Sequence, residues 1–351
     1  MSLPESYHAF RRTSKVGNEP LTIEKALEKG PAGLQPDDVL IRIHAVSLNF
    51  RDVGMLNGRY PVEVEERGIP ASDCGSEVIA VGSGVQNFKI GDHVAPIFNL
   101  SNITGEENDS MKALGGDTAG VLREFAVFEQ KHLVHLPQYV SWEEASTIAC
   151  AGVTAWTALD MPRTANNGRT ALLQGTGGVS MFALLICLSA GIHPIITSSS
   201  DEKLSSIRKL APEGSISTIN YRTTPDIVTE SKRITGGRGV DVVINNTGPA
   251  SIPQDIECLR KNGIVSLVGF LEGFGTSLDP SLFASLMFKT AKIQGIGVGS
   301  KKDFEDLNQH LQTQKVGLKP LIDRVFEFED SRAAFDYLYS GKHVGKVVIK
   351  V

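Results

Sequence analysis

The stretch that decides the fold is LLQGTGGVS, which runs from Leu172 to Ser180. A short apolar run leads directly into a glycine-rich turn, and the turn opens an apolar helix that is expected over Ser180–Ala190 and closed by Gly191. Such a turn lets backbone N–H groups approach a pyrophosphate at the positive end of the helix. The fingerprint usually has Gly or Ala where this chain has Ser180, so a tight strand–helix connection without a ligand is the alternative.

Buried strands alternate with helices from this turn onward. The apolar runs that predict strands are Thr170–Gln174, Ile192–Thr197, Ser217–Tyr221, Val240–Asn245, Gly263–Val268 and Ile293–Val298. Continuous apolar runs are typical of parallel strands that are covered on both faces, and six of them suit the two halves of a doubly wound sheet. The glycine-rich turn follows the first run, which is the position that the fingerprint requires. A further helix is expected over Asp201–Leu210, opened by Ser200.

The first third of the chain is instead rich in short strands and turns. Alternating or β-branched apolar patterning marks Asp38–Val46, Cys74–Val81 and Glu124–Phe128, with glycine-containing turns along the segment. This pattern predicts an antiparallel, partly open β-barrel. The period changes near Ser141, where a helix is expected over Ser141–Leu159.

The end of the chain is expected to return to the first domain, through a polar helix at Lys302–Gln314 and a strand at Lys346–Val351. The predicted fold class is α/β. The predicted domains are residues 1–140 as the first part of the barrel domain, residues 141–300 as the doubly wound domain, and residues 301–351 as the return to the barrel.

Composition and charge exclude several classes of protein. The chain has 351 residues, enough for two domains, and 35 Lys and Arg against 40 Asp and Glu give a net charge of −5. Without a basic field, nucleic acid and membrane are not expected partners. The four cysteines, Cys74, Cys150, Cys187 and Cys258, form no C-x-x-C pair, and the first residues contain no apolar targeting segment. A cytoplasmic location is expected.

The end of the second predicted strand bears on which dinucleotide would bind. An NAD site usually offers Asp or Glu about 20 residues after the glycines, whereas this chain has three serines, Ser198 to Ser200. Lys203 follows one turn into the next helix, and Tyr221 ends the third strand. Hydroxyl donors and a cation suit a 2′-phosphate, so NADPH is the predicted cofactor. In the alternative, the serines only cap the helix and Asp201 or Glu202 turns inward.

Motifs spread over nearly the whole chain carry a family resemblance. They include SLNFRD from Ser47, IPASDCGSEVIAVGSGVQNFKIGDHVAP from Ile69, CAGVTAWTAL from Cys150, QGTGGVSMFAL from Gln174 and GKVVIKV from Gly345. In these motifs and their order the sequence resembles the medium-chain dehydrogenase/reductase superfamily, specifically its zinc-independent branch of quinone oxidoreductases and enoyl reductases. The resemblance implies a GroES-like β-barrel catalytic domain and a Rossmann domain, with a cleft between them.

The resemblance also bears on metal binding. Catalytic zinc in the zinc alcohol dehydrogenases of this superfamily needs Cys, His and a further Cys or Asp. Matched segment to segment, those positions are Asn49, Ser72 and Ala151, none of them a normal zinc ligand, and residues 99–120 contain no cysteine for a structural zinc lobe. No metal is therefore expected. A displaced site built from Asp73, Cys74 and Cys150 is the alternative.

Without a Lewis acid, conjugate reduction is easier to explain than alcohol oxidation. The resemblance places Asn49, Asp52 and Tyr60 on the barrel side of the cleft and Thr154 near the nicotinamide. We expect Asn49 to donate to the substrate carbonyl, Tyr60 to orient substrate or relay a proton, and Thr154 to position the ring, with water as the alternative proton source. For Asp52, pairing with Arg51 to hold the loop is the stronger alternative, and Tyr60 could simply close the lip of the barrel.

The predicted cofactor-binding residues lie at the carboxyl ends of the strands, where ligands bind in doubly wound sheets. They are Gly175, Thr176, Gly177, Gly178, Val179, Ser198, Ser199, Lys203, Tyr221, Asn246, Thr247, Gly248, Gly269, Phe270, Gly297 and Val298, together with Lys346 near the end of the chain. Lys346 would approach the cofactor phosphate or only stabilise its own strand.

Three further features bear on substrate and partners. Apolar residues at Phe98, Phe270, Phe274, Phe283 and Met287 suggest an apolar or conjugated carbonyl substrate, although at such spacings they are more often core. The polar segment over residues 99–120 is long for a connection and could cover part of the substrate entrance. The family resemblance implies a homodimer joined through the sixth strands.

The predicted function is an NADPH-dependent, zinc-independent oxidoreductase that transfers a hydride to an activated C=C bond or a quinone. The enzymatic alternative is an alcohol or carbonyl oxidoreductase that uses the same cofactor. A noncatalytic cofactor-binding protein, structural or regulatory, is the alternative of another class, because a fold does not fix its function.

Overall fold

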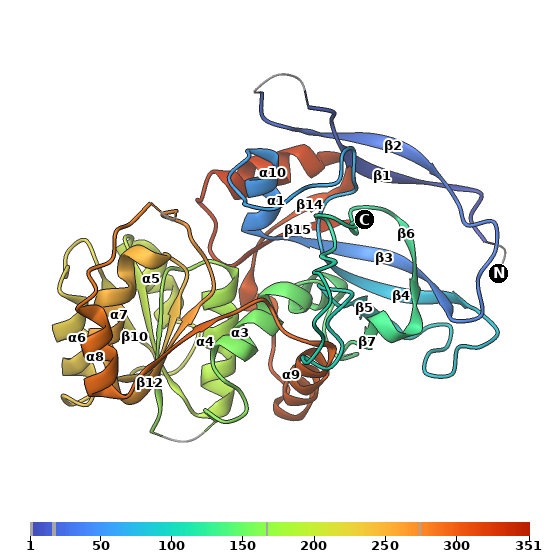
Figure 1. Cartoon of the computed structure of the whole chain (residues 1–351). Helices are drawn as coiled ribbons and strands as arrows, with labels where there is room; N and C mark the ends of the chain where they lie inside the picture. The colour runs from blue at the N-terminus through green and yellow to red at the C-terminus, as the bar shows by residue number, and fades with distance from the viewer. Residues whose placement is uncertain (1–2, 16–18, 166–167, 274) are drawn as a thin grey trace. The chain divides into compact units, whose positions relative to one another are not determined.

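The computed structural model describes residues 3–15, 19–165, 168–273 and 275–351 (Figure 1). Phe274, one of the apolar residues singled out above, lies outside these ranges. The chain divides into two compact units, one made of Met1–Val153 with Gly299–Val351 and the other of Thr154–Val298. The first unit therefore includes residues 141–153, which the sequence assigned to the doubly wound domain.

The second unit is built on a six-stranded parallel sheet. Its strand order is β10 (Ser217–Asn220), β9 (His193–Ser198), β8 (Thr170–Leu173), β11 (Val240–Asn245), β12 (Leu259–Leu267), β13 (Lys292–Gly295). In chain order this is 3-2-1-4-5-6, the order of the Rossmann fold. The predicted doubly wound fold is confirmed, and each predicted strand overlaps an observed one. The largest difference is at β12, which begins four residues before the predicted Gly263.

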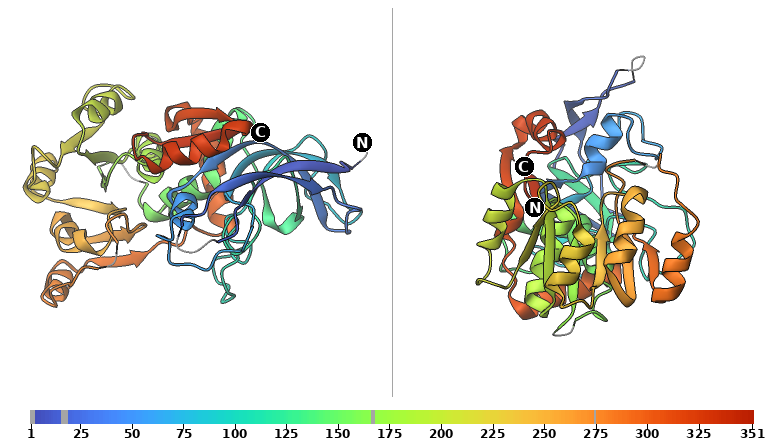
Figure 2. Two further views of the ribbon diagram at one scale, coloured as in Figure 1. Left: turned by 90° about the horizontal axis from the view of Figure 1, so that it is seen from above. Right: turned by 90° about the vertical axis from the view of Figure 1, so that its left-hand side faces the viewer.

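Helices lie on both faces of this sheet (Figures 1 and 2). They are α4 (Gly178–Ala190), α5 (Asp201–Arg208), α6 (Ile227–Ile234), α7 (Ile252–Cys258) and α8 (Leu282–Lys289). Helix α4 ends at Gly191, whose φ of 70° lies in the left-handed region that favours glycine, as the sequence predicted. Helix α5 begins after Ser200, whose hydroxyl accepts from the Lys203 N–H.

The first unit contains a seven-stranded sheet and a separate hairpin. The order is β14 (Ile322–Glu327), β15 (Lys346–Lys350), β3 (Asp38–Leu48), β4 (Asp73–Val81), β5 (His93–Pro96), β7 (Leu133–His135), and β6 (Phe125–Glu129) also pairs with β3. The hairpin is formed by β1 (Ser6–Arg12) and β2 (Ile23–Lys29). Strand β15 pairs antiparallel with β3, so the end of the chain is part of the first unit.

The helices of the first unit are short at the start of the chain and longer at its end. They are α1 (Phe50–Leu56), α2 (Trp142–Ala145), α9 (Lys301–Gln314) and α10 (Ser331–Tyr339). A core of buried Val, Ile, Leu and Phe side chains fills this unit, with β3 contributing five of its seven buried apolar positions to one cluster. Across the described residues, no helix is long and apolar enough to cross a bilayer.

The helix expected over Ser141–Leu159 is broken in the structure, so that prediction is wrong in detail. Helix α2 is followed by a π-helical turn at Ile148–Gly152 and then by α3 (Val153–Ala158). The Cys150 N–H donates to the Asp73 carboxylate at 3.2 Å. A side chain that takes a backbone donor in this way competes with the regular helical ladder, which is a recognised cause of such irregularities.

Candidate functional site

Asn49 lies between the end of β3 and the start of α1, in the first unit. Its backbone N–H donates to Asp52 Oδ2 at 2.7 Å, so the Asp52 side chain closes the N-terminus of α1. The Asn49 side-chain nitrogen lies 3.5 Å from the Ser72 hydroxyl. The Asn49 side chain is half-buried, with the Ser72 hydroxyl as the neighbour of its amide nitrogen.

A buried cation lies against Asn49. Lys346 begins β15 and is only 2% exposed. Its ammonium donates to Asn49 Oδ1 at 2.5 Å and to the Leu48 carbonyl at 2.7 Å, and it lies 3.8 Å from Asp73 Oδ2. Because β15 pairs with β3, the fold brings a residue from the end of the chain to the predicted catalytic position.

Asp73 connects these groups to Cys150. It is fully buried, accepts from the Ser72 hydroxyl at 2.5 Å through Oδ1, and accepts from the Cys150 N–H through Oδ2. Burial, with the Asp73 charge, raises the pKa of the Cys150 thiol to about 12. The thiol is therefore neutral near pH 7 and is no activated nucleophile.

Arg51 is the second residue of α1, and its side chain contacts the segment over residues 99–120. It donates to the Leu114 carbonyl at 2.7 Å, and its guanidinium lies 4.8 Å from the ring centre of Phe98 and 5.8 Å from that of Tyr60. Burial raises the pKa of Tyr60. The pKa of Asp52, 1% exposed, is raised by burial against the opposing effect of Arg51, and the pair is 3.9 Å apart. Asp52 thus has the geometry of the loop-holding role that the sequence gave as its alternative.

The glycine-rich turn of the second unit connects β8 to α4. Gly175 has a φ of 75°, and Gly177 is the residue before the helix, with no side chain to cap it. Ser180, the departure from the fingerprint, donates from its hydroxyl to the Gln174 carbonyl at 2.7 Å. The hydroxyl therefore binds the turn to the first turn of the helix.

The predicted 2′-phosphate residues lie around the ends of β9 and β10. The Tyr221 N–H donates to the Ser198 carbonyl, and the Ser198 hydroxyl accepts from the Ser200 N–H. Ser199 is half-buried and Tyr221 is 43% exposed. Asp201 is exposed and accepts from the Asn220 side chain at 2.8 Å. Lys203 is half-buried in the first turn of α5.

The predicted residues after β11 and β12 lie side by side. Gly269 approaches Asn246 so closely that an added Cβ would lie 2.9 Å from the Asn246 carbonyl oxygen, and the Gly248 position meets Phe270 at 3.1 Å. The Glu272 N–H donates to the Thr247 carbonyl. The structure thus brings Asn246–Gly248 together with Gly269 and Phe270 at the carboxyl ends of β11 and β12.

The remaining predicted residues of the second unit lie near its two ends. Thr154 is 4% exposed at the start of the unit, and its carbonyl accepts from the Thr157 hydroxyl. The same hydroxyl donates to the carbonyl of Val298, a β-branched residue with a φ of 69°. Thr157 was not predicted as a site residue, although it lies within the motif CAGVTAWTAL that begins at Cys150. It ties the first turn of the unit to the strained backbone after β13.

Comparisons with known proteins agree with this architecture. The family model for an alcohol dehydrogenase GroES-like domain matches residues 35–138, and that for a zinc-binding dehydrogenase matches residues 178–313. A zinc-type alcohol dehydrogenase-like protein of Schizosaccharomyces pombe is 37% identical over 92% of this chain and 93% of its own. The chain belongs to the medium-chain dehydrogenase/reductase superfamily.

Solved structures of this superfamily have the same fold. A Sinorhizobium meliloti protein assigned as an alcohol dehydrogenase matches with a TM-score of 0.89 and 33% identity over all of both chains. A crotonyl-CoA carboxylase/reductase in complex with NADP matches with a TM-score of 0.84 at 21% identity, over 100% of this chain and 96% of its own. At that identity the second likeness shows the fold alone.

The donor set of this medium-chain dehydrogenase/reductase does not fit a catalytic zinc. Asn49 and Ser72 offer neutral oxygens, Ala151 offers none, and the Asn49 oxygen already accepts from the Lys346 ammonium. A second cation beside that ammonium would be repelled. In the alternative set, the Cys74 thiol is fully buried, and burial raises its pKa to about 12. Within the described residues, no three His, Cys, Asp or Glu side chains are grouped to hold a metal ion.

The second unit, in contrast, fits a dinucleotide. A Cβ added at Gly175 or Gly177 would meet no atom within 4 Å, so the turn exposes backbone at the N-terminus of a 13-residue helix. Backbone N–H groups and the helix dipole favour an anion there. The residues that would hold a pyrophosphate are Gly175 to Val179, all predicted from the sequence.

The sequence did not predict a polar network that begins at Gln174, the residue before this turn. Gln174 donates from its side chain to Asp255 at 2.7 Å, and Asn245 donates to the other oxygen of the same carboxylate at 2.7 Å. Ser251 donates to Asp255 at 3.0 Å. The only available signal was the polar Gln174 and Asn245 at the ends of two apolar strands, which alone does not identify the carboxylate that joins them.

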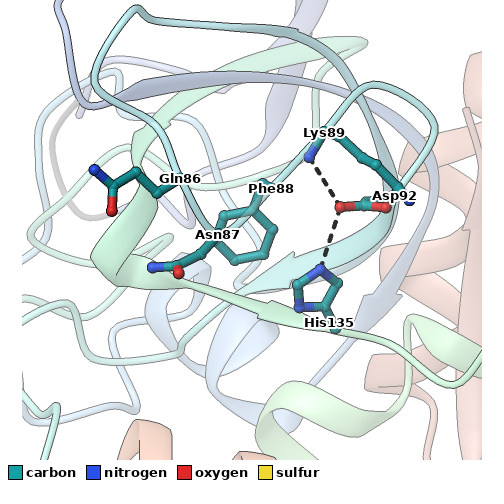
Figure 3. A pocket seen from close by; sticks show the side chains of 6 residues that line it. All are labelled: Gln86, Asn87, Phe88, Lys89, Asp92 and His135. Carbon is teal, nitrogen blue, oxygen red and sulfur yellow. Dashed lines mark hydrogen bonds and ion pairs between the residues drawn. The ribbon is translucent and has the colours of Figure 1, made fainter.

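The segment over residues 99–120 packs within the first unit. Arg12 and Arg51, both buried, donate to the carbonyls of Gly115 and Leu114, and the Lys301 N–H donates to the Asn102 carbonyl. A pocket of about 300 Å³ lies elsewhere on this unit, lined by Gln86, Asn87, Phe88, Lys89, Asp92 and His135 (Figure 3). Asp92 accepts there from the Lys89 N–H and lies 3.2 Å from the His135 ring nitrogen. None of the predicted site residues lines it.

Proposed function

We propose that the chain is an NADPH-dependent, zinc-independent reductase that adds a hydride to an activated C=C bond or a quinone. The observation that carries this proposal is the Lys346 ammonium bonded to Asn49 Oδ1, where the superfamily's zinc enzymes have a metal ligand. The site thereby has a fixed cation and an amide donor in place of a Lewis acid.

The chemistry asked of these residues is stabilisation of a developing oxyanion. A bound nicotinamide dinucleotide would supply the hydride. Asn49 Nδ2 donates to the substrate carbonyl, whose oxygen gains negative charge when the β-carbon is reduced. Lys346 withdraws electron density from the amide through Oδ1 and fixes which way the amide points. The Ser72 hydroxyl accepts from the Asn49 amide and donates to Asp73, which helps to fix the position of that amide.

Proton delivery to the α-carbon falls to Tyr60 or to water. Burial raises the Tyr60 pKa, which keeps its phenol protonated at neutral pH. The Arg51 guanidinium beside the ring holds Tyr60 in place. Thr154, in the other unit, is assigned to positioning the nicotinamide ring.

The preference for NADPH rests on the groups around β9. The exposed Tyr221 and the cation of Lys203 accompany serines rather than a carboxylate at the strand end, and Asp201 is engaged with Asn220. Arg222, exposed next to Tyr221, adds a second cation. A 2′-phosphate suits this set better than a free ribose hydroxyl does.

A cytoplasmic homodimer is part of the proposal. Strand β13 is the last strand of its sheet, with one neighbour only among the described strands. Phe283, Met287 and Phe288 on α8 are 62%, 71% and 78% exposed, which is unusual for apolar side chains of this size. An unpaired strand edge and exposed apolar side chains in the same unit both suit contact with a second copy.

The proposed reaction is tested by following NADPH consumption with a cyclic enone, a quinone and the saturated ketone that corresponds to the enone. Turnover of the first two and not of the ketone is expected. Asn49→Ala should lower kcat by about 10²–10³-fold, the effect of removing one oxyanion donor. Asn57→Ala, at the other end of α1, is the matched control and should keep full activity. NADPH-dependent turnover of the ketone alone would overturn the proposal.

An alcohol or carbonyl oxidoreductase is the second candidate. It is favoured by the names of two similar proteins, the Schizosaccharomyces pombe relative and the Sinorhizobium meliloti structure, at 37% and 33% identity. Turnover of the saturated ketone in the same assay is the result that this candidate predicts.

A further inference from the structure

Asp255 is a buried carboxylate that the proposed chemistry leaves unused. It lies on α7, is 1% exposed, and accepts three hydrogen bonds from side chains. Oδ1 accepts from Gln174 Nε2, while Oδ2 accepts from Asn245 Nδ2 and from the Ser251 hydroxyl. All three donors are neutral groups.

The network continues from Asp255 to the glycine-rich turn. Gln174 is the residue immediately before Gly175, and its Oε1 accepts from the Thr247 N–H at 3.3 Å. Its backbone carbonyl accepts from Asn246 Nδ2 at 3.0 Å. Gln174 can make the contact to Thr247 only with its amide nitrogen turned toward Asp255, since an amide carries its acceptor and its donors on opposite sides. The carboxylate therefore fixes the orientation of this amide.

We propose that Asp255 is a positioning residue for the dinucleotide, and that its ionisation controls how firmly the glycine-rich turn is tied to the end of β11. When Asp255 is ionised, all three donors are satisfied and the Gln174 amide holds Thr247. When it is protonated on Oδ1, the new O–H faces the Gln174 nitrogen. The amide is then favoured in the reversed orientation, which places its donors against the Thr247 N–H.

The change falls in the neutral pH range. Burial raises the pKa of Asp255 to about 7, against the hydrogen bonds of Ser251, Asn245 and Gln174, which lower it. The elements packed against α7 are α6, α8, β11 and β12. Their charged groups, with the titratable groups of α7 itself, are Glu230, Lys232 and Arg233 on α6, Lys289 on α8, Asp241 on β11, Arg260 and Lys261 on β12, and Glu257 and Cys258 on α7. None of them is bonded to the Asp255 carboxylate, whose hydrogen-bond partners among the described residues are all neutral.

The inference rests on the proposed function for the identity of the ligand, and one experiment separates the two. NADPH dissociation constants are measured across pH 6–8 for wild type, Asp255→Asn and Asp241→Asn. Asp241 is an equally buried carboxylate at the opposite end of β11, paired with Arg238 and Arg260, so it is the matched control. Titration of the ligand's own phosphate affects all three proteins alike and cancels in the comparison.

Wild type and Asp241→Asn should both bind NADPH about fivefold more weakly at the acid end of this range, the effect of one lost hydrogen bond. Asp255→Asn should show no such dependence. In the ligand-free protein, the NMR signals of the Thr247 amide and the Gln174 side-chain amide should titrate together near pH 7. This readout tests the inference even where the variant does not fold.

Two results would overturn the inference: equal pH dependence in wild type and Asp255→Asn, or signals of Thr247 and Gln174 that do not titrate. Absence of NADPH binding at every pH, with both signals titrating, would instead refute the proposed function and leave the Asp255 network standing.

Discussion

Each of the two units contains a buried carboxylate next to predicted site residues, and the partners of the two carboxylates differ in charge. Asp73 in the first unit lies 3.8 Å from the Lys346 ammonium, whereas the donors to Asp255 in the second unit, across the part of the chain that the structure describes, are all neutral. The first arrangement keeps a fixed positive charge where an oxyanion would develop. The second permits the carboxylate to become neutral beneath a turn that suits an anion. The comparison links the partners of each buried carboxylate to the charge that its site is proposed to stabilise.

Removing the cation of the first unit should have the largest effect. Lys346→Met leaves Asp73 buried and unpaired, which is expected to lower the free energy of unfolding by about 3–5 kcal/mol. Lys350→Met, at an exposed position of the same strand, is the control and should be nearly neutral. Urea unfolding of both variants checks this. Equal free energies of unfolding for the two variants would mean that the Lys346–Asp73 pair does not stabilise the first unit.

The carboxylate of the second unit should instead reveal itself through pH. Its pKa is raised from 3.8 to about 7 in the folded protein, so the folded state keeps a proton that the unfolded state releases. The stability of wild type relative to Asp255→Asn should therefore fall as pH rises from 4 to 7, by up to about 4 kcal/mol at about 1.4 kcal/mol per pKa unit. Thermal unfolding across this range measures the difference. A difference that is constant or grows with pH contradicts the assignment.

The open turn of the second unit can be filled without disturbing the fold. Gly177 has a φ of −78° and space for a Cβ, so Gly177→Ala should change stability by less than about 1 kcal/mol. The added methyl group occupies the path of the pyrophosphate, and NADPH affinity should fall about tenfold, equivalent to 1.4 kcal/mol. Gly33→Ala, also in open space but in the first unit, is the control. Unchanged affinity in the first variant would refute the assigned pyrophosphate position.

The smallest expected effect concerns the choice between cofactors. Lys203→Gln should raise the KM for NADPH severalfold, about the contribution of one charge-assisted hydrogen bond, and leave the KM for NADH unchanged. Steady-state kinetics with both cofactors measures the split. A parallel rise in both values would show that Lys203 supports the fold of α5 rather than the 2′-phosphate.

The sequence predicted the sheet of the second unit well because periodicity and glycine chemistry are local. Six apolar runs, the turn at Gly175 and the left-handed cap at Gly191 each follow from a few neighbouring residues. The helix expected over Ser141–Leu159 failed because a distant group, the Asp73 carboxylate, takes the N–H of Cys150. A competitor far away in the chain leaves no trace in local periodicity.

The same difference between local and long-range features applies to the residues of the candidate site. Asn49 and the glycines were found because motifs mark them. The bond from Lys346 to Asn49 spans almost 300 positions of the chain and depends on how β15 pairs with β3, so no spacing rule indicates it. The Asp255 network likewise joins residues from β11, α7 and the end of β8. Long-range polar contacts are what the sequence could not supply.

The zinc content of the purified protein tests the central claim most directly, because the proposal has Lys346 and Asn49 stabilise the developing oxyanion without a metal ion. Elemental analysis of the enzyme, isolated without chelator and shown to reduce an enone with NADPH, should find far less than one zinc per chain. One tightly held zinc per chain, with activity lost on its removal and restored on its return, would contradict the account.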